Sequence, residues 1–112
     1  MIRTLLKSKI HRCRVTESNV QYEGSITIAE DLMRASDLWE GEKVLVSSVT
    51  SGARIETYVQ KGKAGSGEIV INGGAANLIQ KGEILTIMSF TPSATPIVPK
   101  RIVCDEQNNI IR

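Results

Sequence analysis

Tyr22-Glu23-Gly24-Ser25-Ile26-Thr27-Ile28 joins a glycine directly to a short run of β-branched residues. Isoleucine and threonine favour extended backbone, so Ser25–Ile28 is predicted to be a short strand that begins immediately after Gly24. Glycine has no Cβ atom and reaches conformations that other residues avoid. The stretch therefore predicts a tight backbone position at the entrance to a strand, and we interpret the rest of the chain around it.

The serine of this stretch is placed to react with its own backbone. If the peptide bond is strained, the Ser25 hydroxyl can attack the carbonyl carbon of Gly24 and convert the amide to an ester. β-Elimination then frees Gly24 as a carboxylate, and position 25 hydrolyses to a ketone, a pyruvoyl group. Such a ketone condenses with a substrate amine and accepts electrons, as pyridoxal phosphate does elsewhere. Gly-Ser is a common dipeptide, so the alternative is an ordinary loop entering a strand.

Length and composition limit the class of protein. A chain of 112 residues forms one domain with a single modest core. No apolar run approaches the ~18 residues of a membrane span. The apolar part of residues 1–7 is too short for a signal peptide, so we expect a cytoplasmic protein. A formal charge of +2 is too small to indicate nucleic-acid binding by itself.

The residues that usually bind metals are scarce. Cys13 and Cys104 show no metal-ligand spacing, and we expect buried free thiols rather than a disulfide framework. His11 is the single histidine, and no His/Cys cluster exists that would hold zinc. We therefore expect no metal site.

Short runs of β-branched and aliphatic residues recur along the chain between turn signals. We expect strands over 4–15, 25–28, 43–49, 54–60, 68–71, 84–90 and, at an edge, 101–105. One helix is predicted over 29–36 and a shorter one after Asn72. The segments between them are predicted to be a turn over 16–19, extended backbone over 20–22, a hairpin connection over 50–53, a loop over 61–67, an irregular crossing segment marked by Pro92, Pro96 and Pro99, and a frayed end over 107–112.

Many short strands, glycine-rich turns and few helices predict an all-β protein with a closed barrel. The interior of so small a barrel is filled by side chains, so a ligand would bind at the rim or between subunits. Alternation along strand 54–60 puts Arg54 and Tyr58 on one face and Thr57 on the other, and Lys9 and His11 share a face of the first strand.

Several separated motifs together resemble the aspartate 1-decarboxylase family, the pyruvoyl-dependent enzymes that make β-alanine for pantothenate. The motifs are Met1-Ile2-Arg3-Thr4, Lys9-Ile10-His11-Arg12, Val15-Thr16, Tyr22-Glu23-Gly24-Ser25, Arg54 with Thr57-Tyr58, and Asn72-Gly73 followed by Ala75-Ala76. Gly74 departs from the alanine of many relatives. The resemblance covers nearly the whole chain.

The resemblance implies a six-stranded double-psi β-barrel that assembles as a homotetramer with active sites between neighbouring subunits. It implies a precursor that cleaves itself between Gly24 and Ser25 into a β chain, residues 1–24, and an α chain, residues 25–112. The α chain would begin with the covalent pyruvoyl group derived from Ser25. Whether maturation needs an accessory factor stays open.

The resemblance also implies roles for individual residues. Thr57 would hold the carbonyl before the serine during cleavage, and Tyr58 would donate a proton to the substrate. Binding of L-aspartate would fall to Lys9, Arg54, Thr57 and the backbone of Gly73, Gly74 and Ala75. His11, Tyr22 and Asn72 would support the site. Which carboxylate Arg54 and Lys9 each bind stays open.

Two other functions compete with this interpretation. The first is a pyruvoyl-dependent decarboxylase of another amino acid. The second is a non-catalytic small β-barrel, a binding or assembly module that would stay uncut. No partner nucleic acid or membrane is expected for the enzyme.

Overall fold

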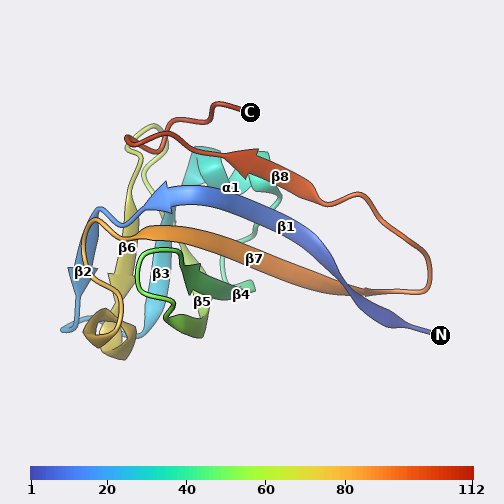
Figure 1. Ribbon diagram of the computed structural model, residues 1–112, viewed down its shortest axis with the longest axis horizontal. Helices are drawn as coiled ribbons and strands as arrows, with labels where there is room; N and C mark the ends of the chain where they lie inside the picture. Colours follow the sequence, from blue (N-terminus) through green and yellow to red (C-terminus); the bar gives the residue numbers. More distant parts are fainter.

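Strands dominate the computed structural model, which describes residues 1–112 and has an all-β fold (Figure 1). Its elements are β1 (Arg3–Arg14), β2 (Glu17–Asn19), β3 (Ser25–Ala29), α1 (Glu30–Ser36), β4 (Lys43–Ser48), β5 (Arg54–Gly62), β6 (Ile69–Asn72), the 3₁₀ helix η1 (Gly73–Asn77), β7 (Ile84–Ser93) and β8 (Lys100–Val103). The predicted strands and the predicted helix are confirmed with boundaries shifted by a few residues. Neither helix has the length and apolar character needed to span a bilayer.

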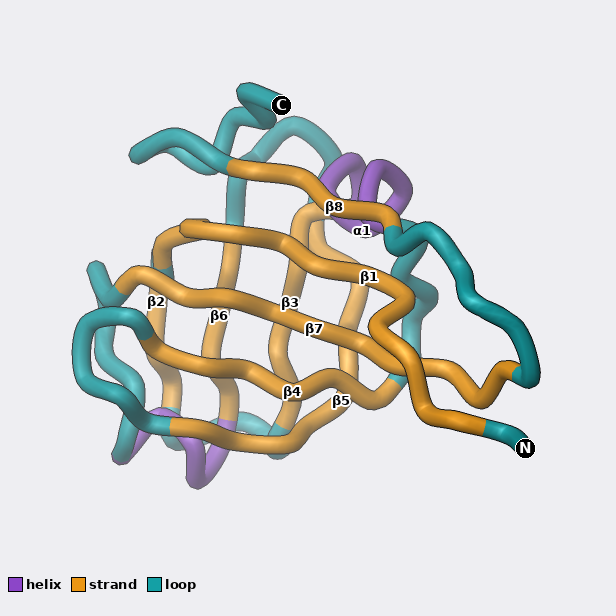
Figure 2. The backbone as a smooth tube through the Cα atoms, turned by 45° about the vertical axis from the view of Figure 1, so that its right-hand side comes forward, coloured by secondary structure: helices purple, strands orange, loops and turns teal.

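The strands close into a ring because β1 and β2 act as one interrupted strand. The sheet order is β2-β6-β3-β5-β4-β7-β1-β8, which places β1 and β2 near opposite ends. Only Val15 and Thr16 separate them: Val15 N–H donates to Glu83 O at 3.0 Å and Thr16 N–H to Ile69 O at 2.8 Å. The first half of this interrupted strand, β1, pairs with β7, and its second half, β2, pairs with β6. This double pairing closes the ring, and Figure 2 shows the resulting barrel. This six-stranded ring, with the short β8 added at its edge, agrees with the predicted double-psi barrel.

One apolar core fills the barrel. Alternate residues of each strand point inward, so branched side chains from facing strands pack against one another. The core residues with no exposed surface include Ile10, Ile26, Ile28, Val46, Val59, Ile69, Ile71, Leu85 and Ile87. Helix α1 packs against β8 and contributes Leu32 and Met33 to the same core. The filled interior leaves function to the outer surface and the rim.

The segment between β1 and β3 differs from the prediction. Residues 17–19, predicted to be a turn, form β2, and residues 20–22, predicted to be extended, contain the turn. The polar residues pair because β6 offers a long-range partner: Thr16 Oγ1 donates to Ile69 O and accepts from Ile69 N–H, both at 3.0 Å. A local propensity argument cannot detect that pairing.

The C-terminal segment, predicted to fray, is held against the barrel. Asn108 is buried, and its Nδ2 donates to Arg14 O at 2.9 Å and to Gly67 O at 2.7 Å. Its Oδ1 accepts from Arg14 N–H at 2.7 Å. A single asparagine amide therefore ties the end of the chain to β1 and to the loop before β6.

Beyond the barrel, β1 and β7 continue as a two-stranded arm (Figure 1). The register still pairs Arg3 with Ser93 and Thr4 with Pro92, so β7 runs past the point where prolines predicted irregular backbone. Pro92 is compatible with this position because the arm lies outside the ring, where a missing ladder donor is tolerated.

Glu83 fastens two turns at one end of the barrel. Its Oε1 accepts from Ser48 Oγ at 2.6 Å and Ser51 Oγ at 2.9 Å, and its Oε2 accepts from Gln80 N–H at 2.6 Å. Burial by itself would raise the pKa of Glu83, but these three hydrogen bonds together lower it below the ordinary value. The carboxylate is therefore the form that the fold prefers.

We expect Glu83→Gln to destabilise the fold at neutral pH by about 1.5–3 kcal/mol, the usual worth of hydrogen bonds to a charged group. The folded-state pKa is lowered, so the stabilisation is present above the ordinary value of 4.5 and is lost as the pH falls through the folded-state value. Urea unfolding at pH 7 and pH 3.5 measures both effects. If the difference in unfolding free energy between the unmodified chain and Glu83→Gln were the same at both pH values, this role of Glu83 would be contradicted.

Candidate active site

Ser25 lies at the start of β3, directly opposite Asn72 at the end of β6. Both are buried, with 2% of Ser25 and 3% of Asn72 exposed. The two residues are 47 positions apart in sequence, and the antiparallel pairing of β3 with β6 brings them together. A hydroxyl at this position is shielded from water and surrounded by fixed polar groups.

Two polar atoms lie within hydrogen-bond distance of the Ser25 hydroxyl oxygen. Ser25 Oγ–H donates to Glu23 O at 3.3 Å, and Asn72 Nδ2 donates to Ser25 Oγ at 3.1 Å. The same Asn72 nitrogen lies 3.1 Å from Thr27 Oγ1. Ser25 Oγ thus meets an N–H donor on one side while its own proton points back along the chain. An N–H that faces this oxygen would stabilise negative charge developing there.

Gly73 presses against the peptide that precedes Ser25. A Cβ atom at position 73 would lie 2.6 Å from Gly24 Cα and 2.7 Å from Gly24 N, and Gly73 has φ of +81°. Both the left-handed backbone and the close approach require glycine here. Gly24, by contrast, has open space around the position of its missing Cβ. The glycine with a demonstrable steric need is therefore Gly73, whereas the sequence directed attention to Gly24.

We expect Gly73→Ala to displace the 22–24 segment and to destabilise the fold by about 1–3 kcal/mol, since it combines a strained φ with a backbone clash. Chain cleavage at Ser25 should slow with it, as seen on a denaturing gel. Gly74→Ala is the matched control for stability and cleavage, because nothing lies within 4 Å of its added Cβ and its φ is not positive. Equal effects of the two substitutions would contradict this role of Gly73.

Tyr58 lies beside Ser25 across the parallel pair β3 and β5. Ile26 pairs with Val59, so Ser25 and Tyr58 each precede a paired residue and share one side of the sheet. Tyr58 keeps 37% of its surface exposed. Arg54 is exposed on the same face of β5, whereas Thr57 is half-buried on the opposite face, as the alternation predicted.

Arg54 carries a charge without a partner on its own chain. Glu56, its neighbour on the same face, instead pairs with Lys43 at 2.7 Å. None of the four ion pairs of the structure includes Arg54. Its guanidinium group remains available for a bidentate contact with a carboxylate.

Lys9 and His11 lie away from this cluster. Both are on the outer face of β1, and β7 and β4 separate β1 from β5 in the sheet. Desolvation and the charges of Lys9, Arg12 and Arg112 lower the pKa of His11 below its ordinary value. Its Nδ1 lies 3.3 Å from Thr86 Oγ1. A single chain therefore does not bring Lys9 and His11 to Ser25.

The remaining predicted residues flank the Ser25 peptide. Tyr22 is 65% exposed, but its carbonyl oxygen lies 3.1 Å from the position that a Gly73 Cβ would take. Gly73, Gly74 and Ala75 open η1, and Ala75 packs on the core. No hydrogen bond of the turns and loops uses their N–H groups. These groups form an edge beside Ser25 that could bind an anion.

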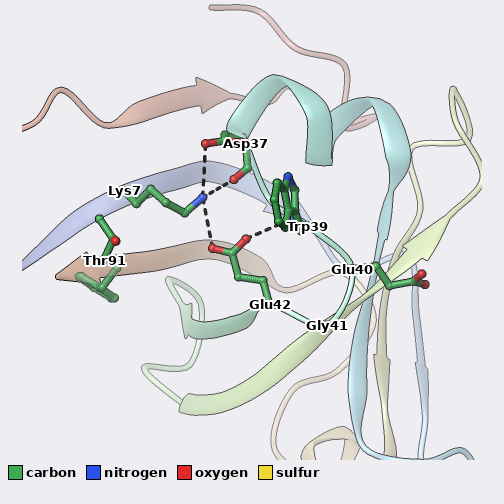
Figure 3. A pocket seen from close by; sticks show the side chains of 8 residues that line it. Lys7, Asp37, Trp39, Glu40, Gly41, Glu42 and Thr91 are labelled. Carbon is green, nitrogen blue, oxygen red and sulfur yellow. Dashed lines mark hydrogen bonds and ion pairs between the residues drawn. The ribbon is translucent and has the colours of Figure 1, made fainter. Parts of the chain in front are cut away.

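Ser25 lines none of the three main hollows of the single chain. The hollow drawn in Figure 3, about 500 Å³, is lined instead by residues around Lys7, Trp39 and Phe90. Its lysine is already neutralised, because Lys7 Nζ lies 3.6 Å from Asp37 Oδ2 and 3.2 Å from Glu42 Oε2. The sequence did not predict this hollow. No group of three or more His, Cys, Asp or Glu side chains lies together as metal ligands do.

Comparison with known proteins assigns the chain to a class of decarboxylases. The family model described as aspartate decarboxylase matches residues 1–111. The chain belongs to the aspartate decarboxylase family.

Individual relatives agree with this assignment. The aspartate 1-decarboxylase of Halalkalibacterium halodurans is 49% identical over 99% of this chain and 91% of its own length. That of Acetivibrio thermocellus is 50% identical over the same shares, and that of a Thermotoga species is 47% identical over 100% and 98%. Among solved structures, the computationally designed msDPBB_sym2 protein aligns with a TM-score of 0.48 and 15% identity, over 78% of this chain and 99% of that protein.

Proposed function

We propose that this chain is a decarboxylase of L-aspartate that releases CO₂ and β-alanine, and that it first cuts itself between Gly24 and Ser25. The family membership and relatives about half identical over nearly the full length support the reaction. The observation that carries the cleavage is the buried Ser25 hydroxyl with an amide N–H at 3.1 Å. β-Alanine is the precursor that the family supplies for pantothenate.

Cleavage begins when Ser25 Oγ attacks the carbonyl carbon of Gly24. The Oγ–C bond forms as the C–N bond breaks, and the hydroxyl proton moves to the freed nitrogen of Ser25. Loss of the Cα proton then breaks the Cβ–Oγ bond and releases Gly24 as a carboxylate. Water replaces the nitrogen, which leaves as ammonia, so the chain 25–112 begins with a pyruvoyl ketone and the chain 1–24 ends at Gly24.

The residues around the cut have distinct roles. The Asn72 amide stabilises the negative charge that develops on Oγ when the Cβ–Oγ bond breaks and this oxygen leaves in the Gly24 carboxylate. Thr57, on the strand beside β3, holds the Gly24 carbonyl oxygen through its hydroxyl. Gly73 lets the 22–24 segment approach closely, and that contact orients the Gly24 carbonyl toward the serine.

The surroundings of position 25 fit a pyruvoyl group. Asn72 lies opposite position 25 in the antiparallel pair, and its Oδ1 is buried without a hydrogen-bond partner, so a polar atom with no partner belongs to the residue that faces the position of the ketone. When formed, the pyruvoyl group binds the substrate amine and accepts the electron pair left by CO₂. Tyr58 and Arg54 lie on the same side of the sheet.

Arg54 binds one substrate carboxylate through two N–H groups, and the N–H groups of Gly73, Gly74 and Ala75 orient the substrate further. Lys9 supplies a second cation. Because Lys9 lies across the barrel from β3, it reaches the site of a neighbouring subunit, with His11 beside it. We therefore propose a homotetramer with sites between chains. A maturation factor and a cytoplasmic location stay predictions of the sequence.

Tyr58 supplies the proton that completes the reaction. Its side chain lies beside residue 25, and its phenol delivers a proton to the substrate Cα after CO₂ has left. The departing carboxylate is held only weakly, because strong binding of its charged form would stabilise the substrate more than the transition state.

Product analysis with matched amino acids tests this function. Purified protein incubated with L-aspartate should release β-alanine and CO₂, and incubation with L-glutamate should give far less product, since the longer side chain misplaces one carboxylate relative to Arg54. Equal turnover of both acids would favour a decarboxylase of another amino acid. No CO₂ from any amino acid would remove the enzymatic function.

A further inference from the structure

The Thr27 hydroxyl is hydrogen-bonded to the side-chain amide of Asn72, which also contacts the reactive Ser25. Ser25 and Thr27 are two positions apart on β3 and therefore lie on one face of the strand. Asn72 Nδ2 lies 3.1 Å from Ser25 Oγ and 3.1 Å from Thr27 Oγ1. The two N–H bonds of one amide group thus bridge two hydroxyls on the neighbouring strand.

The direction of the Ser25 proton decides how this amide must be turned. Ser25 Oγ–H donates to Glu23 O, so the serine presents a lone pair to Asn72 and requires an N–H there. Asn72 Oδ1 stays buried without a partner in this orientation, an arrangement that costs about 1–3 kcal/mol. Something must therefore offset that cost and keep the nitrogen on the β3 side.

Thr27 supplies the second acceptor that does so. With Thr27 present, both N–H bonds of Asn72 are satisfied and only the oxygen lacks a partner. Without the Thr27 hydroxyl, one N–H bond and the oxygen of the Asn72 amide would both lack a partner in a buried site. The orientation that directs an N–H to Ser25 Oγ would then no longer be favoured. The methyl group of Thr27 packs separately: a Cβ at Gly62 would lie 3.0 Å from Thr27 Cγ2.

We propose that Thr27 is a positioning residue for self-cleavage, which holds the Asn72 amide with an N–H on Ser25 Oγ. The proposal rests on the self-cleavage proposed above. Thr27 does not touch the bond that breaks. It acts through Asn72, whose N–H stabilises the negative charge that develops on Oγ when the Cβ–Oγ bond of the ester breaks and this oxygen leaves in the Gly24 carboxylate.

Threonine allows two complementary variants. Thr27→Val keeps the shape and the methyl group but removes the hydroxyl, whereas Thr27→Ser keeps the hydroxyl and removes the methyl group. The conversion of freshly purified precursor into fragments 1–24 and 25–112 is followed over time on denaturing gels and by intact-mass spectrometry. This readout is independent of decarboxylase activity.

Thr27→Val should cut about 10-fold more slowly than the unmodified chain, less than the full loss of a transition-state donor, and Thr27→Ser should cut at nearly the unmodified rate. Cleavage of the valine variant at the unmodified rate, or equal slowing of both variants, would overturn the role of Thr27. If valine prevents folding, Thr27→Ala serves in its place with the same expected slowing. An unmodified chain that never cuts would refute self-cleavage itself, a separate result.

A double substitution separates positioning from a general structural effect. In an Asn72→Ala chain, the additional Thr27→Val change should slow cleavage no further, because the amide that Thr27 holds is gone. A full additional 10-fold slowing in that background would show that Thr27 acts by another route and would overturn the proposal. If the Asn72→Ala chain does not cut measurably, the difference in cleavage rate between Thr27→Val and Thr27→Ser tests the proposal.

Discussion

Ser25→Ala is expected to leave a folded chain of residues 1–112 uncut and without decarboxylase activity. A methyl group has no oxygen to attack the Gly24 carbonyl, so neither the new chain ends nor the pyruvoyl group can form. The fold should survive with a loss of about 1–3 kcal/mol, because the Asn72 N–H loses its acceptor in a buried site. A denaturing gel, an intact-mass spectrum and a β-alanine assay measure these effects.

The matched control is Ser66→Ala. Ser66 lies in the exposed loop before β6. Its Oγ bonds only within that loop: it donates to Lys63 O and Glu68 Oε2 and accepts from Glu68 N–H. This variant should be cut and should decarboxylate like the unmodified chain. Two fragments from the Ser25→Ala chain, or any β-alanine formed by it, would show that the reactive group arises elsewhere.

Tyr58→Phe is expected to cut normally and then to decarboxylate about 10²–10⁴-fold more slowly, the range for loss of a general acid. The phenyl ring keeps the packing of Tyr58 on β5 and removes only the proton donor. Cleavage does not use this hydroxyl and should proceed to completion. Single-turnover kinetics with L-aspartate, together with the fragment pattern, separates the two steps.

Glu56→Gln provides the comparison for Tyr58→Phe. Glu56 lies two residues earlier on the same face of β5 and is paired with Lys43 in an exposed position. Its substitution should change the rate less than twofold, since exposed ion pairs contribute little. Full activity in Tyr58→Phe would rule out Tyr58 as the proton donor.

The barrel was largely predictable because its signals are local. Alternation along 54–60 put Arg54 and Tyr58 on one face and Thr57 on the other, and the apolar run at 84–90 predicted a strand; both are confirmed. The errors fall where distant pairing outweighs propensity. Residues 17–19 are polar and turn-like, yet β6 recruits them into a strand.

The site was predictable as a set of residues but not as an arrangement. The resemblance singled out Ser25, Tyr58 and Asn72, and the structure places them on three adjacent strands. It did not single out Thr27, although its spacing of two from Ser25 was a usable signal for a shared face. The need for glycine at position 73 arises from contact with Gly24, which only the fold reveals.

The central claim is that a serine becomes a ketone and the chain breaks before it, and an intact-mass spectrum of freshly purified, fully matured protein tests this most directly. The account predicts two species, residues 1–24 with a free carboxylate and residues 25–112 lighter by one ammonia than a serine-terminated chain. The heavier species should react with a hydrazine. A single species with the mass of all 112 residues and no reactive carbonyl would contradict it.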